Sequence, residues 1–213
     1  MARVRVRQHV NPLSKQYQMP VSVPDWNQVY AQTTKPLHLD IGCGRGEFLL
    51  QMATQQPDWN FLGLEIREPL VKQANTKVLD LGLSNLLFLF CNANSSIDSL
   101  LSSWPHGALQ RVTIQFPDPW FKKRQAKRRI VQPTLVDTLG AYLTSGGEVF
   151  VQSDVEEVAV EMRSRFDAHR AFYRPETAWL PTNPLPVPTE REIATLARGE
   201  PVYRMLFFRR DDV

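Results

Sequence analysis

The chain has 213 residues, of which 43% are hydrophobic, and its net charge is only +3, so it is long enough for one domain with a complete core. Its two cysteines, Cys43 and Cys91, show no paired spacing and no nearby histidine, which argues against a metal site and fits the reducing environment of the cytoplasm. The longest apolar run, residues 86–91, is too short to cross a bilayer, so we expect no membrane attachment.

Residues 1–35 contain several prolines and little hydrophobic periodicity, so we expect an N-terminal arm ahead of a single domain at residues 36–213. The arm is either a flexible terminus or a contact for RNA phosphates, which the alternating Arg3, Arg5 and Arg7 would favour.

From residue 37 onward, short apolar runs alternate with longer amphipathic segments. This alternation predicts an α/β fold with a mostly parallel sheet and helices on both faces. A last strand at residues 202–209 follows a proline-rich stretch, which we interpret as a loop facing the substrate, and we expect this strand to be antiparallel. The other predicted strands are residues 37–41, 60–66, 85–91, 111–116 and 148–153, and the helices follow Glu47, Glu68, Val131 and Asp154.

A glycine-rich turn, LDIGCGRG, follows the first strand. Gly42, Gly44 and Gly46 form a GxGxG pattern, whereas a dinucleotide fingerprint needs its third glycine at position 47, where Glu47 stands. A carboxylate at the start of the next helix would repel a pyrophosphate. The turn therefore indicates S-adenosylmethionine, which carries no phosphate, and a methyltransferase.

Three polar residues near the strand ends support this cofactor. Asp40 can meet the cationic methionine end, and Glu65 ends the next strand where a carboxylate accepts the ribose hydroxyls. Asn92, after the third strand, can bond the edge of adenine. The glycine turn alone would equally suit a simple strand-to-helix connection, but together with these polar residues it favours a cofactor site. We assign no chemistry to Cys43.

The run FPDPWFKKRQAKRRIVQP, residues 116–133, begins at the carboxyl end of the fourth strand. Six of the eight residues from 122 to 129 are basic, and Trp120 and Phe121 beside them offer faces for stacking bases. Although an isolated charge run is usually a solvated surface, this one follows Asp118, which two prolines hold at the catalytic edge. The run therefore predicts a nucleic-acid substrate and a reactive-site carboxylate.

The sequence also resembles the tRNA (guanine-N7-)-methyltransferases, whose signature after the fourth strand is close to FPDPW followed by K and KRR. The similarity continues through LDIGCGRG, GLEIR, CNAN, SDVEEV, PTEREI and PVYR, and only residues 1–35 lack a match. The resemblance implies a Rossmann-like class I methyltransferase fold with a seven-stranded sheet, S-adenosylmethionine as donor, and N7 of a guanine in the tRNA variable loop as acceptor.

The resemblance also implies roles for individual residues. Asp118 would be catalytic and, with Asp40, Glu65 and Asn92, would bind the cofactor, beside Gly42, Gly44 and Gly46, which the glycine turn itself already indicates. Lys122, Asp154, Thr189, Glu190, Arg191 and Glu192 would bind the substrate, and we expect phosphate contacts from Lys123, Arg124, Lys127, Arg128 and Arg129.

Some positions depart from the family pattern, since many members have His where Phe121 and Gln125 stand and Asp where Asn92 stands. Two alternatives stay open: methylation of another RNA position, such as an exocyclic amine, or a non-catalytic RNA-binding protein with this fold. The absence of an [ND]PP[YF] motif argues against the amine, and the carboxylates argue against loss of catalysis. We expect a cytoplasmic monomer or homodimer.

Overall fold

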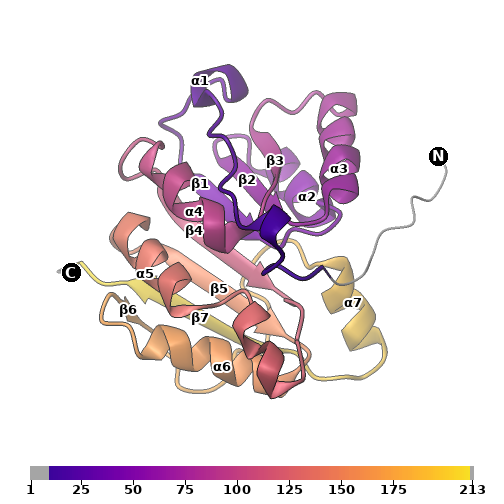
Figure 1. The fold of residues 1–213 in the computed structure, drawn as a ribbon, viewed down its shortest axis with the longest axis vertical. Helices are drawn as coiled ribbons and strands as arrows, with labels where there is room; N and C mark the ends of the chain where they lie inside the picture. The colour runs from indigo at the N-terminus through magenta and orange to yellow at the C-terminus, as the bar shows by residue number, and fades with distance from the viewer. Residues whose placement is uncertain (1–9, 212–213) are drawn as a thin grey trace.

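The computed structural model describes residues 10–211, and one sheet of seven strands forms its centre (Figure 1). The strand order is β3-β2-β1-β4-β5-β7-β6. Strands β1 to β5 are parallel to one another, and β7 runs antiparallel to both β5 and β6. The strands are β1 (Leu37–Ile41), β2 (Asn60–Glu65), β3 (Leu86–Phe90), β4 (Leu109–Gln115), β5 (Glu148–Ser153), β6 (Phe172–Tyr173) and β7 (Tyr203–Arg209).

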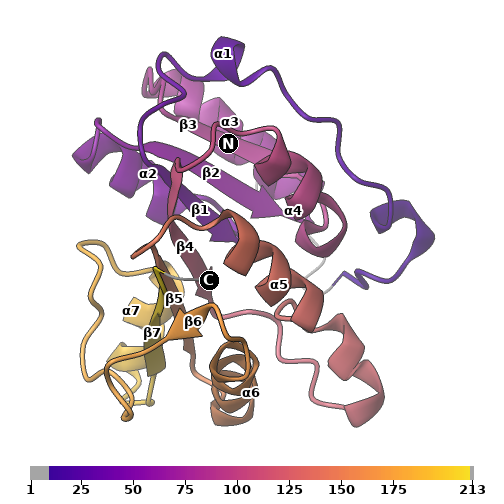
Figure 2. The ribbon, with the colours of Figure 1, turned by 90° about the vertical axis from the view of Figure 1, so that its left-hand side faces the viewer.

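This arrangement confirms the predicted fold class, including the antiparallel last strand. Every residue of β1 and β2 is buried, as expected for parallel strands with helices on both faces. Figure 2 shows α4, α5 and α6 together on one side of the sheet, opposite α2 and α7. The helices are α1 (Trp26–Val29), α2 (Glu47–Gln55), α3 (Glu68–Asp80), α4 (Ala93–Ser102), α5 (Pro133–Tyr142), α6 (Glu156–Asp167) and α7 (Glu190–Ala197).

Two hydrophobic cores result, one on each face of the sheet. The larger core joins α4, α5 and α6 to the sheet, and the smaller joins α2, α3 and the segment before α7. Helix α4 was not predicted from its polar-looking sequence, although its apolar stripe of Ile97, Leu100 and Leu101 and its Asn92 cap are both readable signals. Among residues 10–211, no helix is long and apolar enough to span a membrane.

Residues 10–35 lie against the domain rather than apart from it. Trp26 and Tyr30 are buried in the larger core, where both rings pack against Trp104. The backbone N–H of Val21 donates to Ser96 of α4, and the carbonyl of Tyr17 accepts from Ser95. The domain boundary at residue 35 stays a prediction, and the alternating arginines at positions 3, 5 and 7 lie outside the described residues.

Candidate active site

A cleft lies at the carboxyl ends of β1, β2, β3 and β4, where ligands bind in open α/β sheets. It brings residues from the glycine loop and the strand ends together with residues of the segment after β4. The lining includes Gly42, Glu65, Arg67, Asn92, Asp118, Trp120 and Arg128.

The glycine loop turns through left-handed backbone conformations before α2 begins. Gly46 is the N-cap of α2 with φ of 77°, and a Cβ there would stand 2.6 Å from the Phe88 ring. Glycine is therefore required at this position for two reasons, conformation and close approach. Glu47, at the first turn of α2, pairs with Lys77 of α3. Burial raises the pKa of the Cys43 thiol well above its usual value, so a reactive thiolate is disfavoured.

The carboxylate of Glu65 is buried and held by four hydrogen bonds. Gly44 N donates to Oε2 at 2.9 Å, and Arg67 N donates to Oε1 at 3.0 Å. The Arg67 guanidinium adds a bond to each oxygen, at 2.8 and 2.9 Å. The loop and the end of β2 are thus fixed to each other, with the carboxylate at the wall of the cleft.

Asp40 is the last but one residue of β1, directly before the glycine loop, and is almost fully buried. Its Oδ1 accepts a hydrogen bond from Thr113 Oγ1 at 2.6 Å, and that hydroxyl also lies 3.1 Å from His38 Nε2. Burial raises the pKa of Asp40 to about 7, with Glu65 also raising it, although Thr113 and Gln115 act in the opposite direction. The carboxyl group can therefore change protonation near neutral pH.

Asn92 lines the cleft and caps α4. Its Oδ1 accepts from Asn94 N, and its Nδ2 donates to the carbonyl of Pro12 at 3.2 Å. Pro12 and Val10 also line the cleft, so the N-terminal segment contributes to this wall. The sequence did not single out these two residues, because neither carries a chemical signal.

Asp118 is exposed at the cleft, and the backbone on either side of it is strained. Phe116 and Trp120 have φ values of 50° and 43°, in the left-handed region that bulky residues rarely adopt. Such strain costs about 1–3 kcal/mol per residue and is found most often at functional sites. The hydrogen bond to Glu65 is the main reason that the pKa of the Arg67 guanidinium is raised. Asp118 lies near enough to add to this increase.

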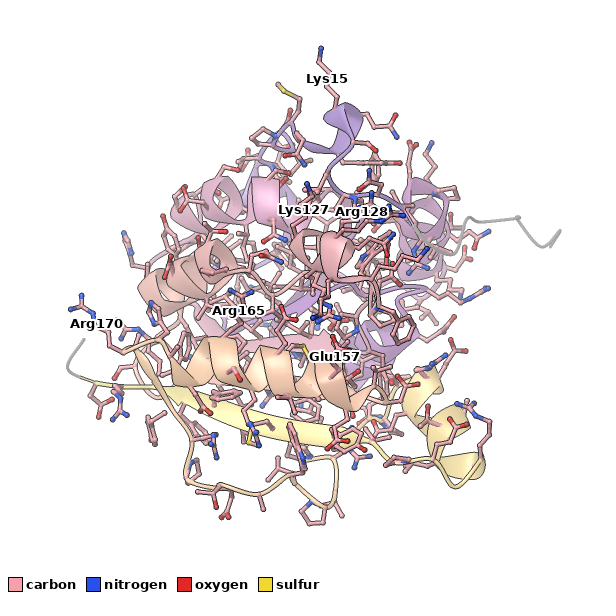
Figure 3. All side chains as sticks on the ribbon, turned by 60° about the horizontal axis from the view of Figure 1, so that its bottom comes forward. Lys15, Lys127, Arg128, Glu157, Arg165 and Arg170 are labelled. Carbon is pink, nitrogen blue, oxygen red and sulfur yellow. The ribbon has the colours of Figure 1, made fainter. Side chains whose placement is uncertain are left out.

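The basic segment forms the 3-10 helix η2 (Lys123–Arg128) beside the cleft. Lys122, Lys123, Arg124 and Lys127 are exposed, whereas Arg128 stacks over the Trp120 ring at 5.0 Å from its centroid. Figure 3 shows Lys127 and Arg128 together on this turn, above the start of α6.

Arg129 does not share this exposure. Only 8% of it is accessible, its Nε donates to the Pro119 carbonyl at 2.8 Å, and its guanidinium pairs with Glu157 and Glu161 of α6. Arg129 therefore joins the FPDPW segment to α6, and two carboxylates offset its charge. Its predicted phosphate contact stays a prediction.

The PTEREI segment adds α7 to the edge of the site. Thr189 caps the helix by accepting from Glu192 N, and Arg191 donates to Asp154 Oδ2 at 2.9 Å. Glu190 and Arg191 are exposed. Glu192, however, is 2% exposed and pairs with Arg204, Nη2 to Oε1 at 2.7 Å. Its predicted substrate contact stays a prediction.

Sequence reasoning missed the polar residues that hold this arrangement. Arg67 and Arg204 belong to the motifs GLEIR and PVYR, but the sequence assigned no role to either residue, nor to Gln115 or Gln152. One signal was available: polar residues ending the apolar strands β4 and β5 are unusual in a covered parallel sheet.

Comparison with known proteins agrees with this geometry. A family model described as "Putative methyltransferase" matches residues 34–205. A protein of Synechococcus elongatus named tRNA (guanine-N(7)-)-methyltransferase is 62% identical over 98% of each chain. Proteins of the same name from Trichormus variabilis and Synechocystis are 63% and 56% identical, covering 97% and 98% of this chain and 96% and 99% of their own.

Solved structures show the same fold at much lower identity. The 16S rRNA methyltransferase KamB is 16% identical with a TM-score of 0.63, covering 89% of this chain and 95% of its own. The aminoglycoside resistance methyltransferase NpmB1 is 14% identical with a TM-score of 0.55, covering 91% and 98%. The fold is that of the class I methyltransferases.

Proposed function

Because the chain belongs to the family of the tRNA (guanine-N(7)-)-methyltransferases, we propose that it methylates N7 of a guanine in the variable loop of tRNA, using S-adenosylmethionine. One observation carries the proposal: a single cleft joins the glycine loop and Glu65 to Asp118 and Trp120, beside an exposed basic segment.

The residues around the glycine loop fit the cofactor. Gly42 lines the cleft, and a Cβ built on it would meet no atom within 4 Å, so the backbone is open to a ligand. The carboxylate of Asp40 suits a cationic amino-acid end. The carboxylate of Glu65 suits ribose hydroxyls once these replace the hydrogen bonds of the Arg67 guanidinium, and both carboxylates would repel phosphate. The proposed cofactor-binding residues are Asp40, Gly42, Gly44, Gly46, Glu65, Asn92 and Asp118.

Asp118 is the proposed catalytic residue. Guanine N7 attacks through a lone pair and carries no proton, so the transfer needs no general base. S-adenosylmethionine supplies the electrophilic methyl group when it is bound. A fixed carboxylate near the guanine would favour the positive charge that develops on the ring, and the strained backbone around Asp118 limits its freedom to move.

The basic segment and α7 make up the proposed tRNA surface. Exposed cations beside an aromatic ring can neutralise phosphates and stack on bases. The proposed substrate contacts are Lys122, Asp154, Thr189, Glu190 and Arg191, and the proposed phosphate contacts are Lys123, Arg124, Lys127 and Arg128. Arg128 would contact a phosphate while its guanidinium stays stacked on the Trp120 ring.

We also propose that the enzyme works in the cytoplasm, as a monomer or homodimer, with its methyltransferase domain in residues 36–213 and residues 10–35 packed against that domain. The test is incubation of the purified protein with labelled S-adenosylmethionine and unmodified tRNA, followed by mapping of the methylated nucleotide. We expect 7-methylguanosine in the variable loop. Label at another position would favour the second RNA-methyltransferase reading, and cofactor binding without any transfer would favour a non-catalytic RNA-binding protein.

A further inference from the structure

A chain of buried polar side chains connects α7 to the cofactor side of the sheet. It begins at Glu192, whose carboxylate accepts four hydrogen bonds. Arg204 donates two to Oε1, at 2.7 and 3.2 Å, while Asn183 and Gln152 donate to Oε2 at 2.7 and 3.2 Å. A carboxylate accepts about four such bonds, so both oxygens of Glu192 act as acceptors and are saturated.

The charge on Glu192 determines how the next two amides are oriented. Gln152 must present its NH₂ group to the carboxylate, and the same nitrogen also donates to Gln115 Oε1 at 2.7 Å. Gln115 therefore presents its oxygen to Gln152, and its own NH₂ group turns away from that bond. Both glutamines are buried and are register partners at the carboxyl ends of β4 and β5.

The free NH₂ group of Gln115 faces Asp40. Thr113 and Gln115 are two residues apart on β4, so they project from the same face, and Thr113 is the register partner of Asp40 on β1. Thr113 makes a conventional hydrogen bond to Asp40, and Gln115 acts on the same carboxyl group. Gln115 Nε2 makes no conventional hydrogen bond within residues 10–211, so its interaction with Asp40 is long or angled.

We propose that Gln115 and Gln152 are positioning residues that transmit the negative charge of Glu192, as a fixed amide orientation, to the Asp40 carboxyl in the cofactor site. Glu192 orients Gln152, Gln152 orients Gln115, and Gln115 then offers a donor that favours ionised Asp40. The other titratable groups near Asp40 are Glu65 on β2, Cys43 in the glycine loop, and His38 on β1, which reaches Asp40 through the Thr113 hydroxyl. This inference rests on the proposed role of Asp40 in cofactor binding.

The test is the pH dependence of S-adenosylhomocysteine affinity, measured by calorimetry on the full chain from about pH 5 to about pH 9. In the unmodified protein, affinity should fall as Asp40 becomes protonated, and the midpoint is the pH at which half of this fall has occurred. In Gln152→Met the midpoint should move up by about one pH unit, which is about a tenfold loss near neutral pH, with affinity recovering at high pH. A purely structural defect would lower affinity at every pH equally.

Gln115→Met should move the midpoint upward by at least as much as Gln152→Met does. If Gln152→Met does not fold, the result for Gln115→Met alone decides whether the proposal holds. Asn85→Leu is the matched control, because Asn85 is an equally buried amide that bonds backbone carbonyls away from this network. Its midpoint should equal that of the unmodified protein. An unchanged midpoint in a folded glutamine variant would overturn the proposal.

The variant Asp40→Asn tests the role of Asp40 in cofactor binding separately from the relay through the two glutamines. If this variant keeps normal affinity at every pH, the role of Asp40 in cofactor binding is wrong, and the relay falls with it. If Asp40→Asn loses affinity while both glutamine variants keep the normal midpoint, only the relay is wrong.

Discussion

The guanidinium of Arg67 holds the buried carboxylate of Glu65 through two parallel hydrogen bonds, Nε to Oε1 at 2.8 Å and Nη2 to Oε2 at 2.9 Å. Bidentate pairs of this kind are stronger than single charged contacts. If the Arg67 side chain were removed, the carboxylate of Glu65 would keep only two donors, the backbone N–H groups of residues 44 and 67. The pair therefore stabilises the wall of the cleft before any ligand binds.

We predict that substituting alanine for Arg67 lowers the free energy of unfolding by about 1–3 kcal/mol, since it leaves a buried carboxylate incompletely bonded. Urea unfolding without ligand measures this. Lys72→Ala is the control, because Lys72 pairs with Glu68 on an exposed helix face and should cost at most about 1 kcal/mol. Equal losses in the two variants would contradict the structural role of Arg67.

Two glycines of the loop provide a matched pair. Gly46→Ala must place a Cβ 2.6 Å from the Phe88 ring and 3.0 Å from the Ala74 Cβ, whereas Gly42→Ala meets nothing within 4 Å. Both have positive φ, so both lose about 1–2 kcal/mol from conformation, and Gly46→Ala should lose about 1–3 kcal/mol more through overpacking. Thermal or urea unfolding of the two variants measures the difference, and similar stabilities would show that Phe88 yields freely.

The basic residues between positions 122 and 129 should have two different functions, tRNA binding and stabilisation of the fold. Lys122 is exposed, so Lys122→Ala should weaken tRNA binding and reduce the slope of log affinity against log salt by about one unit. Arg129 is buried against Glu157 and Glu161, so Arg129→Ala should leave the slope unchanged and lower stability instead. Filter-binding titrations at several salt concentrations, with unfolding curves for each variant, measure both. A reduced slope in Arg129→Ala would show that this guanidinium reaches RNA.

The contrast between Lys122 and Arg129 shows where sequence reasoning stops. Strand periodicity predicted six of the strands, because alternation of apolar runs and helices depends only on local composition. The six cations between residues 122 and 129 look alike in sequence, yet the 3-10 turn exposes some of them and directs Arg129 toward α6. That difference depends on a packing partner more than 25 residues away in the chain.

Glu192 illustrates the same limit at the other end of the site. Its motif gave it a surface role, but Arg204 on β7 and Gln152 on β5 enclose it. Such pairing becomes visible only when α7, β5 and β7 are placed together, whereas Asp40, Glu65 and Asn92 could be located from their positions at strand ends alone. Their roles in binding remain predictions.

Asp118→Ala should lower the turnover number by about 100-fold or more while S-adenosylhomocysteine affinity changes less, because the carboxylate is proposed to favour charge that develops only during the transfer. Single-turnover methylation of tRNA measures the rate, and calorimetry measures the affinity. Glu190→Ala, at an exposed position on α7, tests whether any lost carboxylate near the RNA has the same effect. Near-normal turnover in Asp118→Ala would exclude its catalytic role.

Asp40 should make the stability of the ligand-free protein depend on pH. Burial raises its pKa to about 7 from the usual 3.8, so between these values the folded protein binds more protons at this site than the unfolded chain does. Its contribution to the free energy of unfolding must then fall as pH rises through this window, by at most about 1.4 kcal/mol per unit, and become constant above it. Asp40→Asn does not titrate, so the stability advantage of this variant should grow from about pH 4 to about pH 7. Urea unfolding of both proteins across this range measures the difference, and a constant difference would mean that Asp40 is already ionised in the folded state at low pH.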